Sequence, residues 1–274
     1  MNYIDDAKKE ILDWENEKPG FLAKISKKIL SPAQEIAGNL VPTEVLEKVT
    51  LAIEKVLSGI AGLSPNTINL DEINNRVGTN HDHFEAKLKA MDLAAKHYWN
   101  YHISYGIGEG AATGVAGLAG LVVDIPALFG LAIRLIQEIS TCYGYDINSK
   151  NEQVYMMNIL STGATSDIDV KASLLIGLKE IEQILLQVAW KKIYESYAQN
   201  EISKKAAIAA FREFCKSIGI QLTKRKALQM IVLIGAVVGA TFNATFINDV
   251  GKAAYMSYRR RKIAEFEGNL IESN

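Results

Sequence analysis

Cysteine and proline are both scarce in this chain of 274 residues, which contains two cysteines and five prolines. Cys142 and Cys215 lie far apart in the sequence and match no metal-binding or redox spacing, so we expect two reduced core thiols of a cytosolic protein. Four prolines fall in the first quarter of the chain, and only Pro126 follows them. A long stretch nearly free of proline favours helices.

A strong charge of either sign is also missing. The formal net charge is −1, which provides no general reason to expect nucleic acid as a partner. The first ten residues contain two aspartates and no apolar run, so no secretory signal is visible. Apolar residues make up 49% of the chain and charged residues 22%, which excludes a disordered chain.

The alternating pattern of β-strands bounded by turn residues is absent as well, so we predict an all-α, multi-helix protein. Residues 63–80, which are rich in asparagine, read as a loop. Three segments are expected: N-terminal amphipathic helices over 1–30, a helical domain over 31–262 and a C-terminal tail over 263–274. The apolar periodicity predicts helices over about 3–16, 20–30, 33–39, 43–60, 82–122, 126–143, 151–161, 168–198, 201–216 and 223–262.

Glycine is concentrated in one place: residues 106–126, GIGEGAATGVAGLAGLVVDIP, hold six of the twenty glycines. Each glycine inside a helix costs about 1 kcal/mol relative to alanine, so close approach of a second helix is the expected compensation. A phosphate-binding loop is not indicated, because no predicted strand precedes the run and no GKS or GKT follows it. The glycines that share one helical stripe are Gly106, Gly110, Gly114, Gly117 and Gly120.

A second segment of small residues, 227–248, contains no charged residue, and Gly235 and Gly239 form another small face. We therefore expect two central Gly/Ala-rich apolar helices or hairpins packed against each other. The uncharged run also has the length of a membrane span. Basic residues flank it on both sides and indicate no orientation. We favour a buried core hairpin over a true span.

Two basic segments are candidates for contact with a membrane surface. The sequence GFLAKISKKIL, residues 20–30, sets apolar residues against lysines, as in a helix that lies in a headgroup interface. The tail SYRRRK could bind phosphate groups at an anionic leaflet. The alternative for the first segment is a surface helix packed on the core, which is more common. The tail could equally be a solvated helix end. The candidates are Phe21, Lys24, Lys27, Lys28, Arg260 and Arg261.

Asp124 is the central polar candidate, because it ends the glycine run and precedes Ile125 and Pro126. The favoured interpretation is a cap, since an acid before a proline-started helix accepts backbone N–H bonds. The alternative is a buried carboxylate that pairs with Arg134 or Arg259 at a pocket. When the two small-residue segments are aligned with an offset of 125 positions, Asp124 matches Asp249 and Arg134 matches Arg259. This match is no better than chance. The candidate set is completed by Glu109 and Asn243.

The histidines do not indicate a metal site. His81 and His83 in NHDHFE lie two residues apart, and a third ligand is not apparent, so we expect solvated side chains near a helix start. His97 and His102 alternate with aromatic residues, which is typical of a core or an interface. No serine elbow with a base is present. We expect no catalytic residues, no metal and no cofactor.

Three segments together resemble the EcsC family of bacterial proteins: EGAATGVAGLAGLVVDIPAL (109–128), CYGYD (142–146) and IGAVVGATFNATFINDVGKAAYMSYRRR (234–261). The resemblance covers roughly residues 30–262. The family is named after an operon that also encodes an ABC transporter linked to protein secretion, and the resemblance carries no established catalytic set. Ile231 and Val232 stand where many members have a proline, which leaves this helix free to run straight.

These observations support three functional hypotheses. The first is a non-enzymatic cytoplasmic protein, peripheral to the inner face of the membrane, that binds lipid or a membrane protein such as an ABC transporter. The second is a soluble enzyme or small-ligand carrier with a cleft around Asp124 and Arg134. The third is a membrane-perturbing effector.

Overall fold

All secondary structure in the described part of the chain is helical, which confirms the predicted all-α class. The computed structural model describes residues 2–15, 41–60, 68–113, 117–164, 212, 214–220, 222, 223, 226 and 237–272. The predicted helices over 20–30, 33–39 and 168–198 lie outside these ranges. No strand occurs within them.

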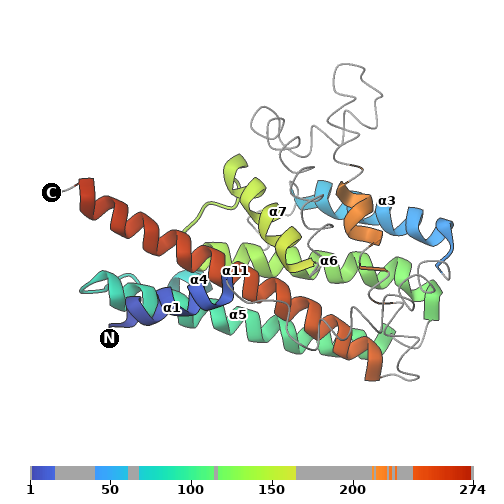
Figure 1. Cartoon of the computed structure of the whole chain (residues 1–274). Helices are drawn as coiled ribbons and strands as arrows, with labels where there is room; N and C mark the ends of the chain where they lie inside the picture. Colours follow the sequence, from blue (N-terminus) through green and yellow to red (C-terminus); the bar gives the residue numbers. More distant parts are fainter. Residues whose placement is uncertain are drawn as a thin grey trace, which may run out of the picture.

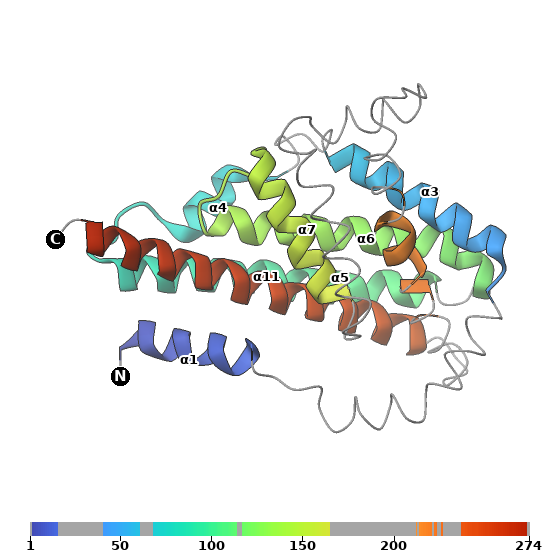
Figure 2. The same ribbon diagram turned by 45° about the horizontal axis from the view of Figure 1, so that its top comes forward.

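Three long helices form the centre of the molecule. Helices α5 (Phe84–Thr113) and α6 (Gly117–Cys142) run in opposite directions, and α11 (Val237–Glu272) lies beside α5 in both views (Figure 1; Figure 2). Helix α11 has 36 residues, and at 1.5 Å per residue it is about 54 Å long. It continues without a break through the predicted tail at 263. The end of α5, the start of α6 and the start of α11 therefore meet at one end of the molecule.

Shorter helices cover this centre (Figure 2). Helix α1 (Tyr3–Glu15) packs on α5 and α11, and α3 (Thr43–Ile60) packs on α6. Helix α7 (Lys150–Ala164) packs on α6 and α11. These three elements confirm the helices predicted over 3–16, 43–60 and 151–161.

The predicted loop over 63–80 is wrong in part, because helix α4 (Leu70–Val77) lies within it. The Asn69 side chain accepts a hydrogen bond from the Glu72 amide and caps the first turn. Gly78 ends the helix with φ 75°, a left-handed conformation that favours glycine. Asparagine and glycine are thus the caps of a short helix here, and Ile73 and Val77 bury its apolar face.

The predicted start of a helix near Pro126 is also wrong. Helix α6 begins at Gly117 and passes through Pro126. A proline inside a helix costs about 3 kcal/mol. Fully burying a large apolar side chain contributes about 1.5–3 kcal/mol, and Leu121, Ile125 and Phe129 are all buried. Burial on both sides of the proline therefore outweighs its cost.

Helix α6 is long and apolar enough to cross a membrane, by length and composition alone. The qualifying segment is Gly120–Cys142, the one such segment in the described ranges, and most of it is buried against the rest of the protein. A buried core helix passes the same test, so this feature is weak evidence for a span. The uncharged run 227–248 lies partly outside the described residues.

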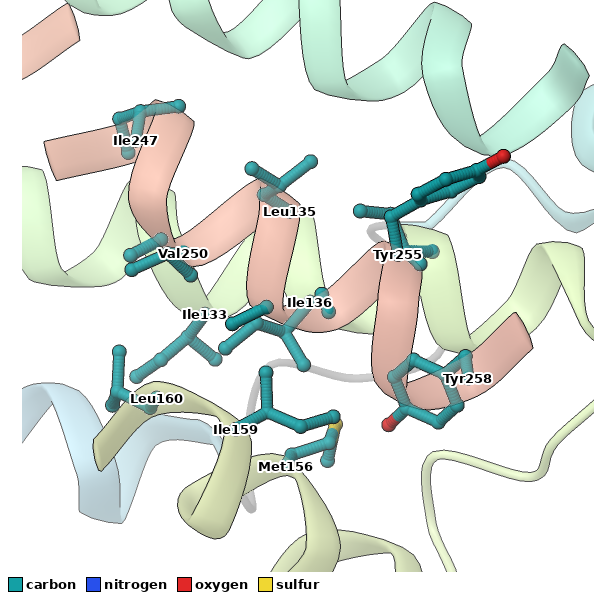
Figure 3. Close-up of a cluster of buried hydrophobic side chains, with 14 of the residues drawn as sticks. Ile133, Leu135, Ile136, Met156, Ile159, Leu160, Ile247, Val250, Tyr255 and Tyr258 are labelled. Atoms are coloured by element: carbon teal, nitrogen blue, oxygen red, sulfur yellow. The ribbon is translucent and has the colours of Figure 1, made fainter. Parts of the chain in front are cut away.

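The apolar core is centred where α6, α7 and α11 meet (Figure 3). Ile133 and Ile136 of α6 lie beside Met156 and Leu160 of α7, beneath α11. Gly163 brings α7 close to α11, since a Cβ atom there would lie 2.7 Å from the Val250 Cα.

Helices α5 and α11 approach closely at two glycines. A Cβ atom on Gly251 would lie 2.3 Å from Cδ1 of Trp99, so the indole ring occupies the space of a side chain. Gly106 faces the backbone of Asn243 and the side chain of Ile247 at 3.5–3.7 Å. Of the other predicted packing glycines, Gly120 is half-buried in α6. Gly114 and Gly235 lie outside the described residues, as do the surroundings of Gly110, Gly117 and Gly239.

Candidate functional site

Asp124 lies in the second turn of α6, and its carboxylate forms a buried ion pair with Lys226. The side chains of Asp124 and Lys226 are 5% and 2% exposed. The Lys226 ammonium also donates to Oδ1 of Asn243, at 3.3 Å, and lies over the ring of Phe242. Burial lowers the pKa of Lys226, while the adjacent carboxylate favours its charged form.

The capping role predicted for Asp124 is therefore wrong, because no helix starts at Pro126. The pairing with Arg134 or Arg259 is wrong as well. Arg134 follows Asp124 by ten residues on the same helix, which separates them by about 15 Å along the axis. Arg259 binds other carboxylates near the opposite end of α11. The hypothesis that Asp124 is a buried carboxylate agrees with the geometry, but the partner is Lys226, which also contacts Asn243.

Arg134 belongs to a second polar cluster, with Glu138 and His102. The Arg134 guanidinium donates from Nε to Glu138 Oε1 at 2.7 Å, one helical turn away. His102 of α5 places Nε2 2.6 Å from Glu138 Oε2. The side chains of His102 and Glu138 are 4% and 9% exposed, whereas that of Arg134 is 28% exposed. The predicted core position of His102 agrees with this geometry, while His97 is exposed.

A cavity of about 520 Å³ opens beside this cluster, between α4, α5 and α6. Its size is that of a small-molecule site. Asp124 is not among its lining residues, so the cleft that we expected around both Asp124 and Arg134 contains only Arg134. The lining residues are Asn69, Glu72, Ile73, His97, Tyr98, Tyr101, His102, Tyr105, Leu131, Arg134 and Glu138.

Arg259 forms a third cluster, which attaches α1 to the centre of the fold. Its guanidinium is 2% exposed and lies 2.8 Å from Asp92 Oδ2 and 2.5 Å from Glu10 Oε2. The hydroxyls of Tyr3 and Tyr143 donate to the two Asp92 oxygens at 2.5 and 2.6 Å. Burial raises the pKa of Asp92, and Arg259 opposes that rise. These contacts are typical of a structural ion pair, because the buried charges of Arg259 and Asp92 lie within ion-pair distance of each other.

Arg261 reaches into a fourth cluster around the buried Glu152. It donates to Glu152 Oε2 at 2.7 Å and stacks over the ring of Tyr145, at 3.9 Å. The hydroxyls of Tyr258 and Ser140 donate to Glu152 Oε1 at 2.5 and 3.1 Å. An arginine that neutralises a buried carboxylate is engaged in the fold. Its predicted role at a membrane surface therefore has little geometric support.

Three other basic residues at this end, Arg260, Lys8 and Lys262, are paired too. Arg260 forms an ion pair with Glu15, and Lys8 forms one with Glu267. Lys262 lies 3.1 Å from Glu265. The other candidates for membrane-surface contact, Phe21, Lys24, Lys27 and Lys28, lie outside the described residues.

The remaining candidates are not brought together. Asp249 is half-buried on α11, and the side chain of Glu109 lies outside what the structure describes. His81 binds the Val77 carbonyl at 2.8 Å, beyond the end of α4. His83 precedes α5, and its carbonyl accepts from the Lys87 amide.

Among the described residues, five buried charged ones were missed at the level of sequence: Glu54, Asp92, Glu138, Glu152 and Lys226. Glu138 had a usable signal, because it follows Arg134 by four residues within an otherwise apolar helix. The partners of the others lie more than 90 residues away or on another helix, which no local spacing encodes.

Comparisons with known proteins agree on one family. The sequence profile of the EcsC protein family matches residues 5–263. Protein EcsC of Bacillus subtilis (strain 168) is 20% identical over 266 residues, which cover 94% of this chain and 96% of that protein. The uncharacterized protein YdbA of the same organism is 29% identical over 181 residues. That alignment covers 66% of this chain and 61% of YdbA. No solved structure matches. The chain belongs to the EcsC protein family.

Proposed function

We propose that this protein is a non-enzymatic helical protein that associates with a membrane, and that it contacts lipid through the end where α5 ends and where α6 and α11 begin. The observation that carries the proposal is the distribution of charge along the molecule. Residues 110–123 and 227–248 contain no charged residue, and the described parts of these segments, 110–113, 117–123 and 237–248, lie at or near this end.

The described side chains near this end support lipid contact. Ile107 of α5 is 46% exposed, and Val123 of α6 is 70% exposed. The nearest described charges, Asp124 and Lys226, are buried and neutralise each other. Among the described side chains at this end, the exposed ones are apolar and the charged ones are paired, and such a surface loses little on entering the interface of a bilayer.

The opposite end differs in a way that fits this orientation. Arg259, Arg260 and Arg261 lie there, each paired with a carboxylate of the same chain. Paired arginines attract an anionic leaflet weakly. We therefore place lipid contact at the uncharged end, and we expect it to depend little on salt.

A vesicle flotation experiment tests the proposal. The full chain is mixed with vesicles of phosphatidylcholine alone or with phosphatidylglycerol, at low and high salt. Val123→Glu and Ile107→Glu each place a charge at the uncharged end and should abolish flotation. Leu93→Glu is the matched control, because Leu93 is 71% exposed on α5 but lies 14 residues before Ile107, about 21 Å along the axis.

We expect the wild type and Leu93→Glu to float with the vesicles. Val123→Glu and Ile107→Glu should stay with the soluble fraction. The proposal is wrong if the wild type stays with the soluble fraction for every vesicle. It is also wrong if all four proteins float equally. Release of a trapped dye by the wild type would instead favour a membrane-perturbing effector.

A further inference from the structure

The cavity beside His102 combines features that nothing in the membrane proposal uses. It is about 520 Å³ in volume and lies between α4, α5 and α6. Two of its lining side chains, His102 and Tyr98, are 97% and 92% buried. Each carries a buried polar atom with no hydrogen-bond partner in the described structure: Nδ1 of His102 and the hydroxyl of Tyr98.

The geometry at Glu138 defines what His102 can accept. Nε2 lies 2.6 Å from a carboxylate oxygen, so this nitrogen carries the hydrogen. Glu138 is already balanced by the Arg134 guanidinium. With its hydrogen on Nε2, the imidazole presents the lone pair of Nδ1 as an acceptor. A buried acceptor without a donor is unfavourable, and a ligand with an N–H group would supply the missing donor.

The aromatic rings of the wall favour a cation. Glu72 and Glu138 contribute two carboxylates; Arg134 balances Glu138, and Arg76, next to the lining, pairs with Glu72 at 2.9 Å, so these charges nearly cancel. An anion would meet both carboxylates and the His102 lone pair. Tyr98, Tyr101 and Tyr105 line the same space with aromatic rings, whose faces attract ammonium groups.

We propose that this cavity binds a small organic amine. The ammonium group donates to His102 Nδ1 and to the Tyr98 hydroxyl oxygen. Its apolar or aromatic body lies against Tyr101 and Leu131. Neither Ile107 nor Val123 lines the cavity, so the two proposals are tested by different variants and stand or fall independently.

Titration calorimetry on the full chain tests the site with three probes of similar shape. These are 2-phenylethylamine, the neutral 2-phenylethanol and the anionic 3-phenylpropionate. The amine should bind at least tenfold more tightly than the alcohol, and the carboxylate should not bind. Glu72→Gln and Tyr101→Ala change exposed positions that the fold tolerates, and each should weaken the amine at least threefold. Leu93→Ala is the matched control on α5 and should bind like the wild type.

A ¹⁵N-histidine NMR titration supplies a second readout that does not depend on affinity. The amine should shift the Nδ1 resonance of His102 and leave that of His81 unchanged, because His81 lies outside the cavity. The proposal is overturned if the carboxylate binds as well as the amine, if no probe binds, or if amine binding is unaffected by Glu72→Gln and Tyr101→Ala.

Discussion

The indole ring of Trp99 occupies the position at which any residue other than glycine would place a side chain at position 251. A Cβ atom there would lie 2.3–2.8 Å from three atoms of the ring. Trp99 is on α5 and Gly251 is on α11, so this contact sets how closely the two long helices approach. Most of the α11 positions that face α5 and α6 are occupied by buried apolar side chains.

Gly251→Ala should destabilise the protein, because the rigid ring can move only if the two helices separate. Overpacking of this kind costs about 1–3 kcal/mol. The control is Gly268→Ala on the same helix, where a Cβ atom meets nothing within 4 Å. That change should be neutral or stabilise by up to about 1 kcal/mol. Urea denaturation measures both, and equal stability of the two variants would refute the close contact.

The buried pair of Asp124 and Lys226 predicts strong coupling between two substitutions. Asp124→Leu or Lys226→Met alone leaves one buried charge without its partner and should cost about 3–5 kcal/mol. The double variant removes both charges and should be much more stable than the sum of the single losses predicts. A double-mutant cycle from urea denaturation measures the coupling. Additive losses would mean that the two groups do not form a pair.

Arg259 and Arg260 are neighbours in sequence with different expected effects. Arg259→Gln leaves the buried Asp92 without its cation and should cost about 3–5 kcal/mol. It should also release α1, seen as faster amide hydrogen exchange over 3–15. Arg260→Gln removes a pair that is 55% and 36% exposed, and such pairs contribute about 0–1 kcal/mol. Similar exchange in both variants would contradict the assignment of Arg259 to the attachment of α1.

Glu54 predicts a dependence of stability on pH. Burial raises the pKa of its carboxyl above the usual value of 4.5, although Arg212 lies 3.6 Å away and opposes this. The folded protein then binds a proton more readily than the unfolded chain. The contribution of Glu54 is therefore fully present below pH 4.5 and is lost as the pH rises through the folded pKa.

Glu54→Gln should accordingly raise the free energy of unfolding at pH 7 by roughly 1 kcal/mol, because it removes a buried charge whose Oε1 has no hydrogen-bond partner. It should have little effect near pH 4. Glu47→Gln, seven residues earlier on α3 and exposed, serves as the control and should change stability at neither pH. Thermal unfolding at both pH values measures the difference. A variant that is less stable at pH 7 would show that the Glu54 carboxylate is stabilised by Arg212.

The helices that the sequence predicted well are those whose apolar spacing is regular, such as α1, α3 and α7. The start of α6 was predicted too far along the chain, because a proline ordinarily marks the start of a helix. The cost of Pro126 inside the helix is outweighed by the burial of the neighbouring apolar side chains, which no local pattern displays. Helix α4 was missed because eight residues hold too few apolar positions to establish a period, although Asn69 and Gly78 were suitable caps.

The candidate site was predictable only where both partners share a helix. Arg134 and Glu138 are four residues apart, so their contact follows from helical geometry. His102 and Lys226 reach their partners across 36 and 102 residues, and the packing of α5, α6 and α11 brings them together. Sequence reasoning therefore found Asp124, Arg134 and Asn243 as buried or polar positions but assigned Asp124 and Arg134 the wrong partners.

The most direct test of membrane association is the depth of a spin label at the uncharged end. A nitroxide is attached to Val123→Cys and, as the control, to Leu93→Cys. Cys142 and Cys215 are buried and should not react. With vesicles present, the label at 123 should become more accessible to oxygen and less accessible to a water-soluble nickel complex, while the label at 93 stays aqueous. Aqueous behaviour at both positions would contradict the proposed contact.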